Sequence, residues 1–397
     1  MFVVGTFSGS ATLGGQVVQA AGGTDVFLAK YTPSGTRLWT KRYGSTGLDS
    51  GLAVAATADG GVAVAGQFAG IVDFGTGPLT ASANGDGFVA AIDATGETRW
   101  VHQASATGMA VFSAITTNSS GDVFTAGRYS GTATIGATSH TAVAGDDVLL
   151  VKYTSAGTLA WSKSIGGTGG DNVGGLATIG DDPVLSGQFS LVLDVGGGAM
   201  TAAGSTDVFV VRLDSALGGH LWSVQFGGTN TDLAKGVVST GSGVAVVGCY
   251  SSSAAFGGPT LTSAGMYDAF VVSLSNSGAT SWAKSFGGAG SDCANVAVGQ
   301  GGDVLASGGF ALSSSFDGTI LTSVGGQDVW VTRLDGASGD VAFARQGGGA
   351  AYDFPTGIAV SGSYFDLSGN TGGAPTMFGH QLVTSGMMDG FLIQSQQ

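Results

Sequence analysis

The chain has 397 residues, of which 74 are Gly and 6 are Pro, and its formal net charge is −14. Hydrophobic residues make up 43% and charged residues 10%, which excludes an intrinsically disordered chain, because disorder needs low hydrophobicity and high charge. The acidic charge argues against a nucleic-acid partner and an anionic membrane surface, and no apolar run is long enough to predict a membrane span.

The first five residues lack the basic start and the apolar core of a signal peptide. Gly, Ser and Thr are abundant and Lys is scarce, which favours an extracellular or cell-surface protein. Because the chain starts inside a repeat, we expect it to be processed, truncated or incomplete.

Three residue series recur every 60 or 61 positions along the whole chain. Each marks one point of a repeat, so we expect one domain over residues 1–397 built from this repeat. The strand-opening aspartates are Asp25, Asp86, Asp147, Asp207, Asp268, Asp328 and Asp389. The large aromatic residues are Trp39, Trp100, Trp161, Trp222 and Trp282, with Phe343 in the sixth place. The glycines that close an apolar run are Gly5, Gly66, Gly127, Gly187, Gly248, Gly308 and Gly369.

Each repeat predicts four antiparallel strands, named A to D, which in one repeat span 112–117, 122–129, 148–153 and 158–164. Tight turns join A to B and C to D, whereas a loop of about twenty residues joins B to C. Four such strands repeated along the chain predict an all-β fold, a β-propeller. The chain opens on a B strand, Phe2–Phe7, and ends on a C strand at 391–394. We therefore predict seven four-stranded blades with the first and last incomplete; the alternative is six blades with leftover strands.

The C–D turn holds a Gly four places before each aromatic residue, as Gly96 precedes Trp100. This stretch resembles the tryptophan-docking motif of quinoprotein-type propellers, which implies that Trp39, Trp100, Trp161, Trp222, Trp282 and Phe343 pack between neighbouring blades. A row of sugar-stacking platforms is the alternative role of these tryptophans. No quinone site aligns with the chain.

The whole repeat resembles the bacterial β-propeller repeat family labelled SBBP. The resemblance rests on Asp25–Tyr31, on the stretch 34–39, and on the Phe-Gly-Gly sequence at 286–288 that precedes Asp292. It implies an exported or surface-attached bacterial protein and supplies no catalytic residues.

The D–A and B–C loops are expected on one face, and long loops bear binding sites more often than tight turns do. A second aspartate series lies on this face: Asp49, Asp171, Asp232, Asp292 and Asp353, with Ala110 in the remaining place. These carboxylates are expected to cap turns; a ring of carboxylates that binds Ca²⁺ is the alternative, and otherwise no cofactor is expected.

The two cysteines, Cys249 and Cys293, fall near the end of a B strand and at the start of the following A strand. We predict a disulfide between them, with two buried free thiols as the alternative. The histidines occupy unrelated places in the repeat, so they indicate no metal site or catalytic pair.

The sequence therefore favours a non-catalytic module for protein or glycan binding or adhesion, with its ligand on the D–A/B–C loop face. One alternative is a structural unit of a surface assembly or filament, formed through the incomplete end blades. The other is a hydrolase or lyase that acts on polysaccharide. A cluster of polar residues found in only one blade would favour the enzyme, whereas an even ring of equivalent residues would count against it.

Overall fold

The computed structural model describes residues 1–258, 260–382 and 388–396, and all regular structure in this part of the chain is β-strand. No helix in it is long and apolar enough to cross a membrane. The chain forms two compact units, one of Met1–Leu185, Leu191–Met200 and Arg212–Leu221, the other of Ser186–Ser190, Thr201–Val211 and Trp222–Gln397. The chain crosses between the two units several times between Leu185 and Trp222.

The four predicted strands recur in chain order, with six A, seven B, seven C and six D strands in the described residues. The A strands are β6 (Ser50–Ala56), β12 (Ala110–Thr117), β16 (Asp171–Ile179), β22 (Asp232–Ser239), β28 (Cys293–Gln300) and β32 (Asp353–Ser361). The B strands are β1 (Phe2–Phe7), β7 (Val62–Phe68), β13 (Val123–Ile135), β17 (Asp182–Phe189), β23 (Gly243–Tyr250), β29 (Asp303–Phe316) and β33 (Tyr364–Thr371). The C strands are β4 (Asp25–Tyr31), β10 (Asp86–Ile92), β14 (Thr138–Tyr153), β20 (Asp207–Leu213), β26 (Asp268–Ser275), β30 (Thr319–Leu334) and β36 (Asp389–Gln396). The D strands are β5 (Arg37–Tyr43), β11 (Thr98–Ala106), β15 (Leu159–Gly167), β21 (His220–Gly228), β27 (Thr280–Gly288) and β31 (Val341–Gly347).

Strands pair in the order A–B–C–D and are antiparallel throughout. The first unit contains β6-β7-β10-β11 and β12-β13-β14-β15, and the second contains β22-β23-β26-β27 and β28-β29-β30-β31. Three-stranded sheets, β1-β4-β5 and β32-β33-β36, hold the first and last repeats. This arrangement confirms the predicted all-β propeller fold, whereas the number of blades stays a prediction.

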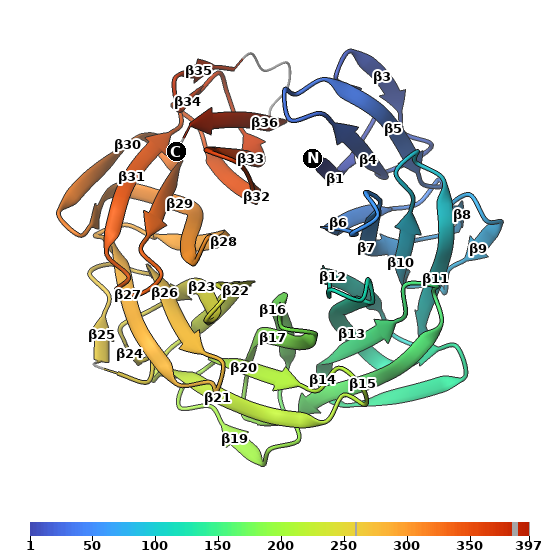
Figure 1. Cartoon of the computed structure of the whole chain (residues 1–397), viewed down its shortest axis with the longest axis horizontal. Helices are drawn as coiled ribbons and strands as arrows, with labels where there is room; N and C mark the ends of the chain where they lie inside the picture. Colours follow the sequence, from blue (N-terminus) through green and yellow to red (C-terminus); the bar gives the residue numbers. More distant parts are fainter. Residues whose placement is uncertain (259, 383–387, 397) are drawn as a thin grey trace. The chain divides into compact units, whose positions relative to one another are not determined.

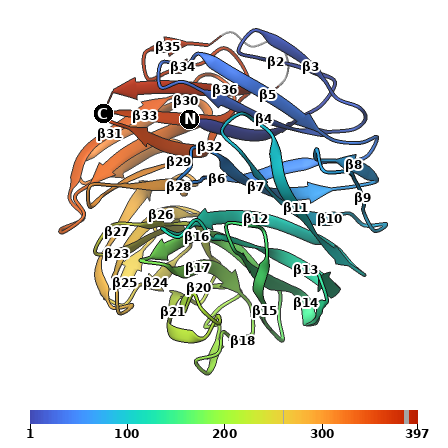
Figure 2. The same cartoon turned by 45° about the vertical axis from the view of Figure 1, so that its right-hand side comes forward.

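The core of each unit lies between successive sheets, whose A strands lie side by side at one edge (Figures 1 and 2). Between the second and third repeats, for example, Val89 of β10 packs in one cluster with Phe112 and Tyr129 of the next sheet. All three are almost completely buried. The strands of a sheet are apolar on both faces for this reason.

The recurring glycine marks the point where the B strand touches a bulge in the A strand. A Cβ atom at Gly127 would lie 1.7 Å from the carbonyl oxygen of Val111, and one at Gly248 would lie 1.9 Å from that of Leu233. No larger residue fits such a backbone contact, so the series reflects packing.

The B–C connections, expected to be loops, are β-hairpins. In two repeats the hairpin is formed by the extended ends of the B and C strands themselves, β13 with β14 and β29 with β30. The end of the hairpin pairs with the D strand of the preceding sheet, as Ile135 pairs with Ala104. Backbone groups that would otherwise be free at the sheet edge are satisfied by this pairing. The separate hairpins are β2 (Ser10–Leu13) with β3 (Gln16–Gln19), β8 (Ile71–Asp73) with β9 (Pro78–Thr80), β18 (Val192–Asp194) with β19 (Ala199–Thr201), β24 (Ser253–Ala255) with β25 (Thr260–Thr262), and β34 (Thr376–Met377) with β35 (His380–Gln381).

Candidate functional site

The two aspartate series form pairs of buried carboxylates between successive sheets. Asp147 of the C strand β14 and Asp171, which begins the next A strand β16, are 0% and 1% exposed and repel one another electrostatically. The same pairing joins Asp25 with Asp49, Asp207 with Asp232, Asp268 with Asp292, and Asp328 with Asp353. The five aspartates predicted on the loop face are thus placed one to a junction.

Each of these aspartates caps its own turn through the same backbone contact. The carboxylate accepts the backbone N–H of the residue four positions earlier: Val143 donates to Asp147 at 3.1 Å and Gly167 donates to Asp171 at 3.0 Å. Each Oδ1 atom of this pair is buried and finds no hydrogen-bond donor among the described residues. Capping explains why aspartate recurs at these positions.

A glycine lies between the two aspartates of each pair in the sequence, because the carboxylate of the first aspartate occupies the space that a side chain at this position would need. A Cβ atom at Gly166 would lie 2.1 Å from Cγ of Asp147, and one at Gly167 would lie 1.6 Å from the carbonyl oxygen of Val192 in the next hairpin. The first glycine of the Phe-Gly-Gly sequence is therefore a steric requirement of the junction. The repeat with Ala110 in place of the second aspartate has Ser105 where the others have this first glycine.

At each junction, burial raises the pKa of one carboxyl group and the second carboxylate of the pair raises it further; these groups are Asp49, Asp171, Asp232, Asp292 and Asp328. The pKa of Asp171 rises to about 7, and those of Asp232 and Asp292 rise to about 6. At the first junction Arg42 forms an ion pair with Asp25, which places a cation beside that pair. No three His, Cys, Asp or Glu side chains in residues 1–258, 260–382 and 388–396 are placed to hold a metal ion together. Calcium binding stays a prediction.

The tryptophans connect successive sheets. The indole N–H of Trp39 donates to the carbonyl oxygen of Ala94, in the C–D turn of the next repeat, at 3.1 Å. The equivalent bonds run from Trp100 to Ser155, Trp161 to Ser215, Trp222 to Asn276 and Trp282 to Gly336. Each ring packs on the turn glycine, whose φ is positive, as at Gly96. Phe343 has no indole N–H and stacks under the Arg345 guanidinium.

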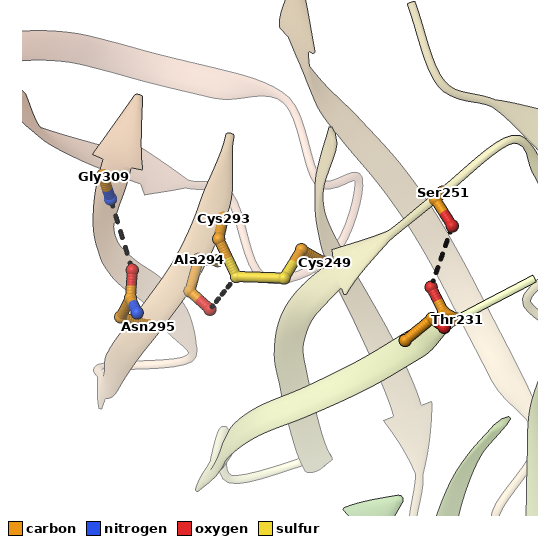
Figure 3. Close-up of a disulfide and its surroundings, with 7 residues drawn as sticks. All are labelled: Thr231, Cys249, Ser251, Cys293, Ala294, Asn295 and Gly309. Atoms are coloured by element: carbon orange, nitrogen blue, oxygen red, sulfur yellow. Dashed lines mark hydrogen bonds between the residues drawn. A yellow bond between two sulfur atoms is a disulfide. The ribbon is translucent and has the colours of Figure 1, made fainter. Parts of the chain in front are cut away.

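Cys249 and Cys293 form the predicted disulfide (Figure 3). It joins the end of β23 to the start of β28, the A strand of the next sheet, with a sequence separation of 44. The bond therefore fastens two successive sheets of the second unit covalently. A persistent disulfide is typical of an oxidising compartment.

A cleft on the D–A/B–C face of the first unit is lined by polar side chains that differ from those of the other repeats. It has a volume of about 430 Å³ and is lined by Arg128, Gly145, Asp146, Gly170, Asp171 and Asn172. The guanidinium of Arg128 donates to Asp146 at 3.0 Å, and both side chains remain partly exposed. Three of these residues have different counterparts elsewhere: Gln67 and Gln188 for Arg128, Gly85 and Thr206 for Asp146, and Ser50 and Leu233 for Asn172.

Sequence reasoning did not predict the cleft around Arg128. Asp146 and Asn172 lie 18 and 44 positions further along the chain, and only the strand pairing brings them to the same end of the sheets. A comparison of all repeats position by position, for charged or amide side chains present in only one repeat, would have found them.

No protein-family model matches this chain, and no curated protein matches it either. Among solved structures it is similar to BamB from Moraxella catarrhalis, with 12% identity, a TM-score of 0.39, and coverage of 91% of this chain and 95% of that one. It is also similar to the quinohemoprotein alcohol dehydrogenase from Comamonas testosteroni, with 11% identity, a TM-score of 0.41, and coverage of 93% and 64%. It is also similar to rhamnogalacturonan lyase YesW, with 11% identity, a TM-score of 0.27, and coverage of 97% of this chain and 72% of that one. At these scores the fold assignment rests on the strand pairing of the chain itself, and the SBBP resemblance stays an expectation.

Proposed function

We propose that the chain is a non-catalytic extracellular or cell-surface propeller module that binds a glycan or protein ligand on its D–A/B–C face. The cleft around Arg128 supports this most directly. It brings together the guanidinium of Arg128, the partly exposed carboxylate of Asp146 and the amide of Asn172, at positions that are mostly uncharged in the other repeats.

The chemistry of the cleft favours a polar, hydroxyl-rich ligand. Arg128 and Asn172 offer N–H donors and Asp146 offers a partly exposed acceptor, whereas no aromatic or large apolar side chain lines the cleft. Hydroxyl groups of a glycan both donate and accept hydrogen bonds, so such a ligand would satisfy both kinds of group. The disulfide supports the extracellular part of the proposal, because it requires an oxidising compartment.

The raised pKa of Asp171 does not favour an enzyme. Asp232 and Asp292 share the same burial and the same carboxylate neighbour in repeats that lack Arg128, so the shift belongs to the scaffold. Asp171 is also 1% exposed, which leaves its oxygen atoms out of reach of a substrate in the open cleft.

The test is a glycan array probed with the wild-type chain and with Arg128→Gln. The variant introduces the residue found at positions 67 and 188, so it is compatible with the repeat. We expect the wild type to retain particular glycans and the variant to lose them, with an unchanged melting temperature. Equal retention by both proteins would contradict the assignment of the cleft, and release of reducing ends from a retained polysaccharide would show an enzyme instead.

A further inference from the structure

In four of the seven repeats, one position of the C strand holds a Lys or Arg. In the first repeat this cation binds turns of the opposite face, where the A–B and C–D turns lie. Lys30 Nζ donates to the carbonyl oxygens of Gly60 at 3.0 Å and Ala94 at 3.1 Å. Ala94 O also accepts the indole N–H of Trp39, so one turn carbonyl binds both groups. The residues at this position are Lys30, Ala91, Lys152, Arg212, Ser273, Arg333 and Gln394.

The third repeat uses the same arrangement. Lys152 Nζ donates to the carbonyl oxygen of Ser215 at 2.8 Å, and this oxygen also accepts the indole N–H of Trp161 at 3.1 Å. Lys152 forms an ion pair with Asp122 at 2.8 Å as well. An ammonium group on an aliphatic stem therefore fills the space beside the docking tryptophan in both repeats.

In the second repeat this position is Ala91, and a cavity of about 230 Å³ lies where the Lys side chain would be. Gly121 and Ser155, the counterparts of the two residues that accept from Lys30, both line it. The carbonyl oxygen of Ser155 accepts the indole N–H of Trp100 at 3.3 Å. The cavity thus keeps the turn carbonyls and the tryptophan of an ammonium site, while the C strand supplies Ala91 in place of the lysine.

The walls of the cavity suit the aliphatic stem that carries an ammonium group. Ala91, Ile92, Val123 and the ring of Trp100 offer an apolar lining for an aliphatic stem. Asp59 and Arg99 also line it as an exposed ion pair, and bonds to Thr57 and Arg99 lower the pKa of Asp59 to about 2, so the pair adds no net charge at neutral pH. The net charge of −14 on the whole chain favours an incoming cation.

We propose that this cavity binds a primary ammonium group on an aliphatic stem, namely a lysine side chain presented by a partner polypeptide. The turn carbonyls accept its N–H groups, as Gly60 and Ala94 accept those of Lys30. Lys30 is the nearest precedent, because it binds the turn carbonyls of Gly60 and Ala94. Lys152, Arg212 and Arg333 each also pair with an acid, and the counterpart of those acids here is Gly61. The site lies on the opposite face from the Arg128 cleft and is independent of the function proposed there.

The probe for the test is n-butylammonium chloride, titrated into the full chain with ¹⁵N-labelled tryptophan. The readout is the indole N–H resonance of Trp100 in NMR spectra, assigned by its loss in Trp100→Phe. We expect a saturable shift of this resonance, with n-butanol binding at least about tenfold more weakly, because a charged donor strengthens the hydrogen bonds. The resonances of Trp39 and Trp161, whose sites hold Lys30 and Lys152, serve as the internal control and should not move.

Three variants separate this site from non-specific binding. Ala91→Lys supplies the ammonium from within the chain and Ala91→Met fills the space of the stem, so both should abolish the titration. Lys30→Ala should create a second site and make the Trp39 resonance respond, a gain that does not depend on how the Ala91 variants fold. The proposal is overturned if Trp100 shows no saturable shift, if butanol binds as tightly, or if Lys30→Ala gains no response at Trp39.

Discussion

Replacing Asp171 with Asn should remove a pH-dependent destabilisation of the fold. Asp171 and Asp147 are buried together, and their two Oδ1 atoms find no donor among the described residues. In the variant, the amide oxygen can still accept the N–H of Gly167, while the amide nitrogen can donate to Asp147. The substitution therefore keeps the turn cap and supplies the missing donor.

The sign and size of the effect follow from the pKa. Burial raises the pKa of Asp171 to about 7, well above that of an aspartate in an unfolded chain, so the folded state binds a proton that the unfolded state releases. The free energy of unfolding should therefore fall as the pH rises from about 4 to about 7 and level off above that. Each tenfold change in proton affinity corresponds to about 1.4 kcal/mol, or roughly 4 kcal/mol over this range. Solvent in the adjacent cleft screens part of this, so we expect about 2 kcal/mol.

The assay is urea unfolding followed by tryptophan fluorescence at several pH values between 5 and 8. Asp171→Asn should reduce the dependence on pH by about 2 kcal/mol and should be more stable than the wild type at pH 8. Asp49→Asn is the matched control, because Arg42 neutralises the partner Asp25 and the gain there should be smaller. If the wild type and Asp171→Asn lose stability in parallel from pH 5 to pH 8, the reasoning is refuted.

Three further substitutions test the junctions between sheets. Gly166→Ala should cost about 2 kcal/mol because its methyl group meets a buried carboxylate, whereas Gly170→Ala in the same loop, with no atom within 4 Å of the added Cβ, should leave the urea midpoint nearly unchanged. Replacing both Cys249 and Cys293 with Ala should lower the free energy of unfolding by about 3–4 kcal/mol, and reductant should shift the wild type equally; an unshifted midpoint would contradict a structural bond. Trp222→Phe keeps the ring but loses one hydrogen bond, so calorimetry should show a loss of about 1 kcal/mol, and a loss as large as that of Trp222→Ala would contradict the docking geometry.

The strands could be predicted because their signals are local. Alternating apolar residues, the turn glycines and the aspartate that begins each C strand all lie within about thirty residues, and repetition removes the ambiguity of any single copy. The disulfide was predictable from the strand order that these signals define. That order places residues 249 and 293 at the same end of adjacent sheets.

The aspartate pairs, the hairpins and the Ala91 cavity could not be predicted in the same way. Asp147 and Asp171 each have a sufficient local explanation as turn caps, so nothing in either turn indicates that the two carboxylates meet. The cavity can be recognised as an ammonium site only by comparison with Lys30. The ammonium group of Lys30 binds turn carbonyls 30 and 64 positions further along the chain. In both cases the informative feature is a difference between repeats in three dimensions.

The pairing of each B–C hairpin with the preceding D strand also bears on how such a chain can grow or be shortened. The sequence that completes a sheet is partly encoded in the following repeat, as Ile135 pairs with Ala104. The unit that could be duplicated in evolution is therefore staggered with respect to the sheet, and a cut at a sheet boundary leaves one D strand without its neighbour. We expect fragments to fold only when they include the hairpin of the next repeat, so that unfolding proceeds in blocks larger than one sheet.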